Sequence, residues 1–340
     1  MAQSKISGMR FRILVFVALS AASLQASVEY TLSAIPVCAG CVLGANDIND
    51  SGAIVGAFTD ASGNFPGDLR IGGIDMLFNP VGSVATDANG LNNLGVIAGD
   101  YFTADGTDHP YIREPDGTFV TPPPPMPSDT AAFFGGVNDA GVFTVNSTTD
   151  PNQVFPYVPF LYNGTSYSPL TLPFSNVTSI VATGINDAGT VVGRYQNTTP
   201  GFGHGFERFA DGTTVDLSFP GARQTFALGV NNSGEVVGGY LLNGVDHGFL
   251  YANGVWTTID FVDANDDPNT KVEGINDLGQ IVGVSFPTGN QFDTTSFVGT
   301  PVPEPGTSGL VALGLLATLF ARWRPRVNAL LRRRVSIERN

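Results

Sequence analysis

The chain has 340 residues, of which 42% are hydrophobic and 14% charged, so a disordered acidic chain is excluded and a substantial core is allowed. The net charge of −14 is uneven: the first 26 residues carry +3 and the last 35 carry +6, which leaves −23 for the stretch between them. So acidic a surface repels phosphates, and we therefore expect no nucleic acid among the partners. The 42 glycines and 23 prolines suit short strands joined by tight turns.

Residues 1–26 have the three parts of a secretory signal peptide. Three basic residues within the first twelve precede an apolar run at 13–22, and small residues then lead to Ala26, where we expect cleavage. The alternative is a short N-terminal membrane anchor, for which an apolar run of ten residues is too short. The sequence therefore predicts export of the remaining chain.

The body of the chain repeats one motif, Asn-x-x-Gly followed by a short apolar run. Successive copies are 43 to 48 residues apart, and a period near 45 over six copies indicates a repeat architecture. The first residues of the six copies are Asn49, Asn92, Asn138, Asn186, Asn231 and Asn276.

Each copy predicts the tight turn of a β-hairpin. The Asn side chain accepts a hydrogen bond from the backbone two residues on, and the Gly takes positive φ, as in a type I turn closed by a Gly bulge. A β-branched residue in the left-handed conformation would cost roughly 1–2 kcal/mol. No helix context or Lys follows, which argues against a phosphate-binding loop. The predicted turn glycines are Gly52, Gly95, Gly141, Gly189, Gly234 and Gly279.

The rest of each period predicts a second hairpin, because Asn-Gly or Asp-Gly pairs separate two further apolar runs. Four short strands in about 45 residues are the content of one propeller blade. The sixth repeat ends after its third strand, Thr295 to Pro301, while Val28 to Pro36 has the pattern of a fourth strand. We therefore predict an all-β fold, a β-propeller of six four-stranded blades over residues 27–301 that this N-terminal strand closes. A seven-bladed ring and a sandwich are the alternatives.

The repeats resemble the HAF-type extracellular repeat, whose tripeptide is occupied here by His204-Gly205-Phe206 and His247-Gly248-Phe249. The resemblance covers nearly the whole body, although three of the six copies lack the His. It implies export and no particular reaction. His109, His204 and His247 occupy one register in different repeats, on the third strand, so we expect structural repetition rather than a shared metal.

Two cysteines, Cys38 and Cys41, lie three residues apart at the start of the body. No second pair is present for a zinc site, and an exported protein meets an oxidising environment. We therefore expect a disulfide across a small loop, with a modest effect on stability.

An acidic segment, residues 263–269, has the alternating oxygen ligands of a calcium loop in Asp263, Asn265 and Asp267. Pro268 stands where such a loop needs Gly, and its twelfth position is Gly274 rather than Glu. We interpret the segment as a loop between blades, with weak calcium binding as the alternative; no other metal site is predicted.

The C-terminal segment, 302–340, combines a Pro-Glu-Pro motif, an apolar stretch at 306–321 and a basic tail. Basic residues after an apolar stretch stay in the cytoplasm, which puts the body outside. The apolar stretch has sixteen residues, fewer than the roughly 20 of an ordinary membrane span, which suits a transient sorting helix better than the alternative of a permanent anchor. The motif comprises Val302, Pro303, Glu304 and Pro305, and the tail comprises Arg322, Arg324, Arg326, Arg332, Arg333 and Arg334.

These three parts, in this order, resemble the PEP-CTERM sorting signal of exported bacterial proteins. The resemblance implies recognition by an exosortase, an intermediate held in the inner membrane, and removal of the tail. It further implies transfer to the cell surface or extracellular matrix of a Gram-negative bacterium that makes exopolysaccharide.

The sequence contains no nucleophile-elbow motif and no metalloprotease motif. We therefore predict a non-catalytic protein without a cofactor, which acts as a binding or structural component of the cell envelope or exopolysaccharide matrix. Its expected partners are the exosortase and an extracellular polysaccharide. The alternative is a propeller enzyme that cleaves a glycan or a lactone, and a cluster of carboxylates at one mouth of the central channel would favour it.

Overall fold

The computed structural model describes residues 28–150, 156–199, 203–263, 268–288 and 294–302. The regular secondary structure in these ranges consists of strands, so the predicted all-β class is confirmed. No helix in the same ranges is long and apolar enough to cross a membrane. The predicted signal peptide, sorting helix and basic tail lie outside the described residues.

The strands fall into six units of four, numbered here in chain order. Unit 1 contains β2 (Val42–Ile48), β3 (Ile54–Thr59), β4 (Gly67–Ile71) and β5 (Ile74–Phe78). Unit 2 contains β6 (Ser83–Leu91), β7 (Ile97–Thr103), β8 (Asp108–Arg113) and β9 (Phe119–Val120). Unit 3 contains β10 (Ala131–Val137), β11 (Phe143–Thr148), β12 (Val158–Tyr162) and β13 (Tyr167–Pro169). Unit 4 contains β14 (Val177–Ile185), β15 (Val191–Asn197), β16 (Gly203–Arg208) and β17 (Thr214–Leu217). Unit 5 contains β18 (Gln224–Val230), β19 (Val236–Leu242), β20 (Val245–Ala252) and β21 (Val255–Ile259). Unit 6 contains β22 (Asn269–Ile275), β23 (Ile281–Phe286), β24 (Thr295–Pro301) and β1 (Tyr30–Ala34).

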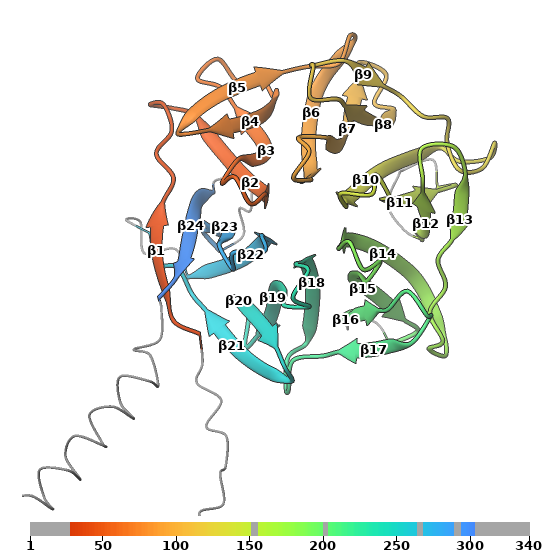
Figure 1. Ribbon diagram of the computed structural model, residues 1–340, viewed down its shortest axis with the longest axis vertical. Helices are drawn as coiled ribbons and strands as arrows, with labels where there is room; N and C mark the ends of the chain where they lie inside the picture. Colours follow the sequence, from red (N-terminus) through yellow and green to blue (C-terminus); the bar gives the residue numbers. More distant parts are fainter. Residues whose placement is uncertain (1–27, 151–155, 200–202, 264–267, 289–293, 303–340) are drawn as a thin grey trace, which may run out of the picture.

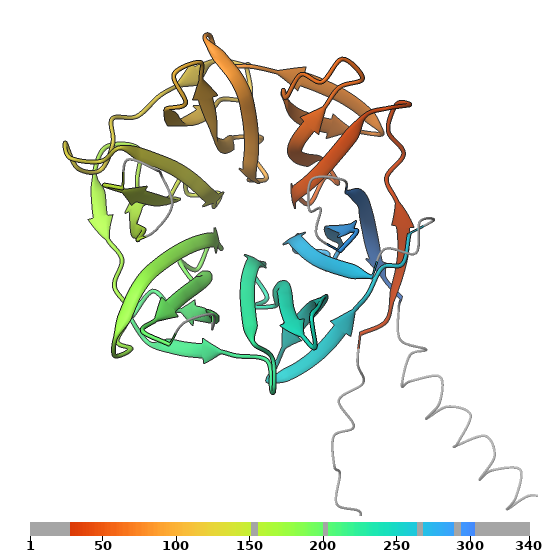
Figure 2. The same cartoon turned by 180° about the vertical axis from the view of Figure 1, so that it is seen from behind.

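The units are arranged around a common centre, with their first strands innermost (Figures 1 and 2). Each unit is an antiparallel meander, as the alternation of short strands and tight turns predicts. Units 4 and 5 also share one parallel pair, Gly203 with Gln224, which joins them into an eight-stranded sheet. This arrangement is a β-propeller-like fold.

The N-terminal strand β1 completes unit 6, as the sequence predicts. It pairs antiparallel with β24, from Tyr30 opposite Pro301 to Ala34 opposite Phe297, and the two strands run side by side in Figure 1. The Tyr30 hydroxyl donates to the Gly279 carbonyl at 3.1 Å. The edge of β24 therefore has a partner that comes from the opposite end of the chain.

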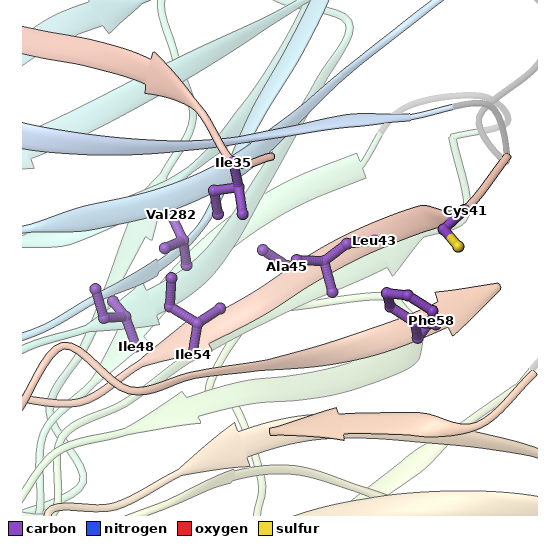
Figure 3. Close-up of a cluster of buried hydrophobic side chains, with 8 residues drawn as sticks. All are labelled: Ile35, Cys41, Leu43, Ala45, Ile48, Ile54, Phe58 and Val282. Atoms are coloured by element: carbon purple, nitrogen blue, oxygen red, sulfur yellow. The ribbon is translucent and has the colours of Figure 1, made fainter. Parts of the chain in front are cut away.

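A hydrophobic cluster joins unit 6 to unit 1 (Figure 3). Ile35, which follows β1, and Val282 of β23 pack against Leu43, Ile54 and other buried side chains of unit 1. Three bonds accompany the packing: the Ala45 amide donates to the Ser296 hydroxyl at 2.9 Å, and the Ser296 and Thr294 hydroxyls both donate to the Leu43 carbonyl. The first and last units are thus held together by both apolar and polar contacts.

A glycine of the second strand faces an aromatic ring of the third strand in four units. The pairs in register are Gly99 with Tyr111, Gly193 with Phe206, Gly238 with Phe249, and Gly283 with Phe297. A Cβ at Gly193 would lie 2.8 Å from the Phe206 ring, so the ring fits because the glycine has no side chain. The aromatic ring of the third strand, which in units 4 and 5 is the Phe of the repeated tripeptide, therefore occupies space that the second-strand glycine leaves open.

All six predicted turn glycines have positive φ, between 70° and 84°. In each turn the glycine amide donates to the carbonyl of the Asn three residues earlier, for example Gly189 to Asn186 at 3.0 Å. The Asn Oδ1 accepts from the amide four residues on, as Asn186 does from Thr190 at 2.9 Å. The repeated motif thus specifies one turn geometry.

Replacing Gly189 by Val should lower the melting temperature by about 2–8 °C, since left-handed strain costs roughly 1–2 kcal/mol. The new Cβ would also lie 3.3 Å from the Ala210 Cβ. Ala188→Val is the matched control, because Ala188 is exposed and has no positive φ. Calorimetry of both variants measures the effect, and equal melting temperatures would contradict the turn assignment.

Candidate functional site

One end of the centre is built from the six repeated turns. Each turn Asn donates from Nδ2 to the backbone carbonyl of the equivalent Asn in the next unit, at 2.9 to 3.2 Å. The sixth bond, from Asn276 to the Asn49 carbonyl at 3.0 Å, returns to the first unit. These buried side chains therefore form a complete circuit, here called the inner circuit, in which each unit is tied to its neighbour.

A second circuit, here called the outer circuit, uses the residue that follows each turn Asn. The backbone amide of each residue donates to Oδ1 of the next, at 2.7 to 2.9 Å, and the last bond joins Asp277 to Asp50. Four of the six side chains are carboxylates. In order, the members are Asp50, Asn93, Asp139, Asp187, Asn232 and Asp277.

The cavity that the residues of both circuits line is small, about 70 Å³, which is room for a few water molecules. The polar atoms of the inner circuit are already paired with protein partners. This end of the centre therefore serves to hold the units together, and a ligand site has to be sought elsewhere.

Away from the turns the centre widens into a pocket of about 240 Å³. It is lined by Asn46, Asn89, Thr183 and Glu273 from innermost strands, together with Arg194 of β15. Burial raises the pKa of Glu273 and lowers that of Arg194, while the charge of each favours the ionised form of the other. The pocket thus combines one cation, one anion and several neutral hydrogen-bonding groups.

Three carboxyl groups gather on the face of unit 2 that points toward unit 3. Asp87 and Asp100 lie opposite each other on β6 and β7. Asp108 lies on the same face of β8, at the position diagonal to Asp100. Burial is the main cause that raises the pKa of all three, and the charges of neighbouring carboxyl groups raise the pKa of Asp100 and Asp108 further. The amide of Asn89 donates to Asp100 at 2.6 Å, which connects the group to the central pocket.

Sequence reasoning missed the pocket-lining residues because most of their types do not repeat. The residue three positions before each turn Asn lines the central pocket, and it is Asn in units 1 and 2 and a different residue in each of the other four. These residues are Asn46, Asn89, Gly135, Thr183, Leu228 and Glu273. The constant spacing to the turn is the signal that could have located them.

The structure places the predicted cysteines and histidines as follows. Cys38 and Cys41 form a disulfide in the segment between β1 and β2, with Cα atoms 5.2 Å apart. His109, His204 and His247 lie on β8, β16 and β20, each with its ring centroid 4.9 to 5.2 Å from that of a tyrosine on the neighbouring strand. They therefore stand on three different units, in one structural role.

The remaining predicted site residues fall at the edge of the described chain or beyond it. Asp263 accepts a hydrogen bond from the Thr295 hydroxyl at 2.7 Å, while Asn265 and Asp267 lie outside the described residues. Within the described ranges no three His, Cys, Asp or Glu side chains gather in a way that could hold a metal. Val302 donates from its amide to the Glu29 carbonyl at 2.8 Å, and the rest of the sorting motif and the basic tail are not described.

The fold and the C-terminal segment together define the class of protein: a β-propeller-like body that is followed by a sorting signal. Residues 301–325 match the family model of the PEP-CTERM protein-sorting motif. This motif is the substrate signal of an exosortase, and it indicates export through a membrane-held sorting intermediate in Gram-negative bacteria. No curated protein matches the chain.

Three solved structures are similar to the described fold. The putative TolB from Agrobacterium tumefaciens has a TM-score of 0.51 and 11% identity, over 82% of this chain and 100% of that one. AofleA from Arthrobotrys oligospora has a TM-score of 0.49 and 12% identity, over 78% and 84%. The SapL1 lectin in complex with alpha methyl fucoside has a TM-score of 0.48 and 14% identity, over 78% and 97%. Of the three, only the TolB structure has a TM-score above 0.5. Because its identity to this chain is 11%, that similarity concerns the fold alone.

The stability of the folded chain should fall as the pH rises from about 4 to about 7. Burial raises the pKa of Asp47 to about 7, and burial with the neighbouring Asp75 raises that of Asp68 to about 7, against 3.8 for a free side chain. Between these values the unfolded chain has lost protons that the folded chain keeps, so the free energy of unfolding decreases. Urea unfolding at pH 4.5 and pH 8 measures the difference.

Asp68→Asn should flatten this pH dependence and raise the stability at pH 8. Asp68 is fully buried opposite Gly56, where other units have an aromatic ring, and the neutral amide needs no costly desolvation of a charge. Glu29→Gln, a change at an exposed position with the same effect on net charge, is the control. An unchanged slope in Asp68→Asn would contradict the assignment.

Proposed function

We propose that the chain is an exported, exosortase-processed protein whose body, residues 27–301, is a six-bladed β-propeller closed by its N-terminal strand. Residues 1–26 are its signal peptide, and residues 302–340 are the sorting segment whose membrane helix and basic tail are removed. The body then acts at the cell surface as a non-catalytic binding component of the envelope or exopolysaccharide matrix, built from HAF-type repeats.

The observation that carries this proposal is the position of the matched sorting motif. It starts at residue 301, where β24 ends, so the signal follows the last strand of the body without a linker. Two features support a closed body: the pairing of β1 with β24 and the bond from Asn276 to Asn49. A body so stabilised suits a protein that works outside the cell.

Expression of the full chain in an exosortase-containing Gram-negative host tests the sorting. We expect surface protein that lacks the basic tail by mass spectrometry, and full-length protein in the inner membrane of an exosortase-deletion strain. Replacing Pro303, Glu304 and Pro305 together by Ala should reproduce the deletion phenotype. Surface protein that retains Arg332 to Arg334 would overturn the proposal.

A second candidate function is cleavage of a glycan, and the carboxyl group cluster of Asp87, Asp100 and Asp108 favours it. Glycoside hydrolysis uses two carboxyl groups, one of which is kept protonated by its surroundings. Incubation of the full chain with the host's exopolysaccharide distinguishes the two functions. Binding without new reducing ends supports the binding component, whereas new reducing ends that disappear in Asp100→Asn would establish the enzyme.

A further inference from the structure

The residues that line the central pocket include one β-bulge position from every unit. In all six units the pairing of the first two strands shifts three residues before the turn Asn, for example between Ala45 and Asp47 in unit 1 and between Val272 and Gly274 in unit 6. The extra residue of a bulge has no partner on the neighbouring strand, so it leaves the regular alternation of the sheet. The bulges therefore turn one residue of each unit toward the central pocket.

Two bulge side chains show which groups lie within reach of this position. Asn46 donates to the Ala88 carbonyl at 3.0 Å, and Thr183 donates to the Ala227 carbonyl at 2.8 Å. In both cases the acceptor lies four residues before the turn Asn of the following unit. A polar bulge side chain that carries a proton donor thus bridges to the next unit along the wall of the pocket.

Glu273 is the bulge residue of unit 6, and as a carboxylate it has no proton to donate. The equivalent carbonyl of the following unit is that of Ala45. Within the described ranges no residue donates a hydrogen bond to the Glu273 carboxylate or forms an ion pair with it. Burial raises its pKa, whereas the charges of Lys271 and Arg194 lower it. A primary ammonium group suits this place, because its three protons serve a carboxylate and a carbonyl at once.

Arg194 supplies the opposite charge from the second strand of unit 4. Since β14 lies between β15 and the centre (Figure 1), Arg194 reaches the pocket through its long side chain. The guanidinium carbon lies 5.3 Å from the centroid of the Phe226 ring, and in the part of the chain that is described the guanidinium group forms no hydrogen bond or ion pair. Its unused N–H groups form a planar fork that matches a carboxylate.

The two charged residues each occur once around the centre. Glu273 is the one charged residue among the six bulge positions, and Arg194 is the one cation at its position of the second strand. The residues equivalent to Arg194 are Ala57, Asp100, Asn146, Gly239 and Val284. The bulge residue of unit 5, Leu228, adds an apolar patch to the wall. The volume of about 240 Å³ is below the roughly 300–1,000 Å³ that is usual for drug-sized ligands, so the pocket suits a smaller molecule.

We propose that the central pocket binds a free α-amino acid with an apolar side chain, whose carboxylate pairs with Arg194, whose ammonium group pairs with Glu273 and whose side chain packs on Leu228. Because Arg194 and Glu273 form no ion pair with each other, a small ligand with both charges neutralises both residues. A ligand with one charge leaves the other buried charge without a partner, which is costly. This site goes beyond the proposed function, which concerns sorting and polysaccharide binding.

Isothermal titration calorimetry on the full-length chain in detergent micelles tests the proposal. The probes are L-valine, L-leucine and L-phenylalanine. For each amino acid the N-acetyl derivative lacks the ammonium group and the methyl ester lacks the carboxylate. We expect at least one of the amino acids to bind, and both of its derivatives to bind at least tenfold more weakly. Binding of none of the three amino acids, or equal binding of a derivative, would overturn the proposal.

Two variants then assign each charge of the ligand to its partner. Glu273→Gln should weaken binding of the amino acid at least tenfold and abolish its preference over the N-acetyl derivative, while the preference over the methyl ester remains. Arg194→Gln should have the reverse effect on the two preferences. Both variants remove a buried charge and should stay folded. Glu29→Gln and Arg223→Gln, at exposed positions that do not line the pocket, are the matched controls. Unchanged binding in either pocket variant would overturn the proposal and would leave the separately measured sorting untouched.

Discussion

Removing residues 28–36 should turn the folded chain into an aggregating one. The deletion takes away β1, so that the edge of β24 loses a partner over five residue pairs and exposes its backbone groups. It also removes Ile35 from the cluster between units 6 and 1, and Tyr30 and Leu32 from that around Phe297. Size-exclusion chromatography with light scattering, and a thermal melt, measure the outcome.

Two controls separate the loss of the strand from the loss of its particular sequence. A synthetic peptide of residues 28–36, added during refolding, should restore soluble monomer because it can pair with β24 in trans. A chimera with Val255–Phe261, which contains the fourth strand of unit 5, in place of 28–36 should also fold. A soluble monomer with an unchanged melting temperature after the deletion alone would show that β1 is dispensable.

Substituting Asn186 by Ala should be the most damaging single change in the turn circuits. Asn186 is 6% exposed, donates to the Asn231 carbonyl at 2.9 Å and accepts from the Thr190 amide at 2.9 Å. The variant leaves the Thr190 amide buried without a partner, at a cost of about 1–3 kcal/mol, and it removes one of the two bonds to the Asn231 carbonyl, which keeps the bond from the Gly234 amide. For a domain of this size, we expect the melting temperature to drop by roughly 5–15 °C.

Asn186→Asp and Asn232→Ala sharpen this test. The Asp variant keeps the acceptor for Thr190 but loses the donor to Asn231, so it should be unstable at pH 7 and partly recover at pH 4, where a protonated carboxyl can donate. Asn232 lies exposed in the outer circuit, where water replaces lost bonds, so its removal should cost less than 1 kcal/mol. Equal melting temperatures for Asn186→Ala and Asn232→Ala would argue against the inner circuit as a stabilising element.

The sequence predicted those parts of the fold that repeat. A hairpin turn depends on local residue types, so six copies of one motif located six turns, and the alternation of apolar runs located most of the strands. The N-terminal strand was predictable because the sixth repeat lacks a fourth strand and Val28 to Pro36 has the matching pattern. The turn Asn was recognised as an acceptor within its own turn.

Two features could not be predicted because they depend on neighbouring units. The donor side of the turn Asn bonds to a carbonyl that is 43 to 48 residues away in five cases and 227 in the sixth. The central pocket of about 240 Å³ is lined by residues from all six units, from Asn46 in the first to Glu273 in the last. No local sequence pattern encodes such contacts between units, because they depend on how the sheets are placed relative to one another.

The inner circuit has a direction, because every amide points to the unit that follows and every carbonyl receives from the unit before. A gene duplication that adds one whole repeat in the interior keeps each donor matched to an acceptor. An added fragment of a repeat, in contrast, leaves one amide and one carbonyl unmatched at its boundary. Changes in the length of such chains during evolution are thereby expected to come in whole periods of about 45 residues.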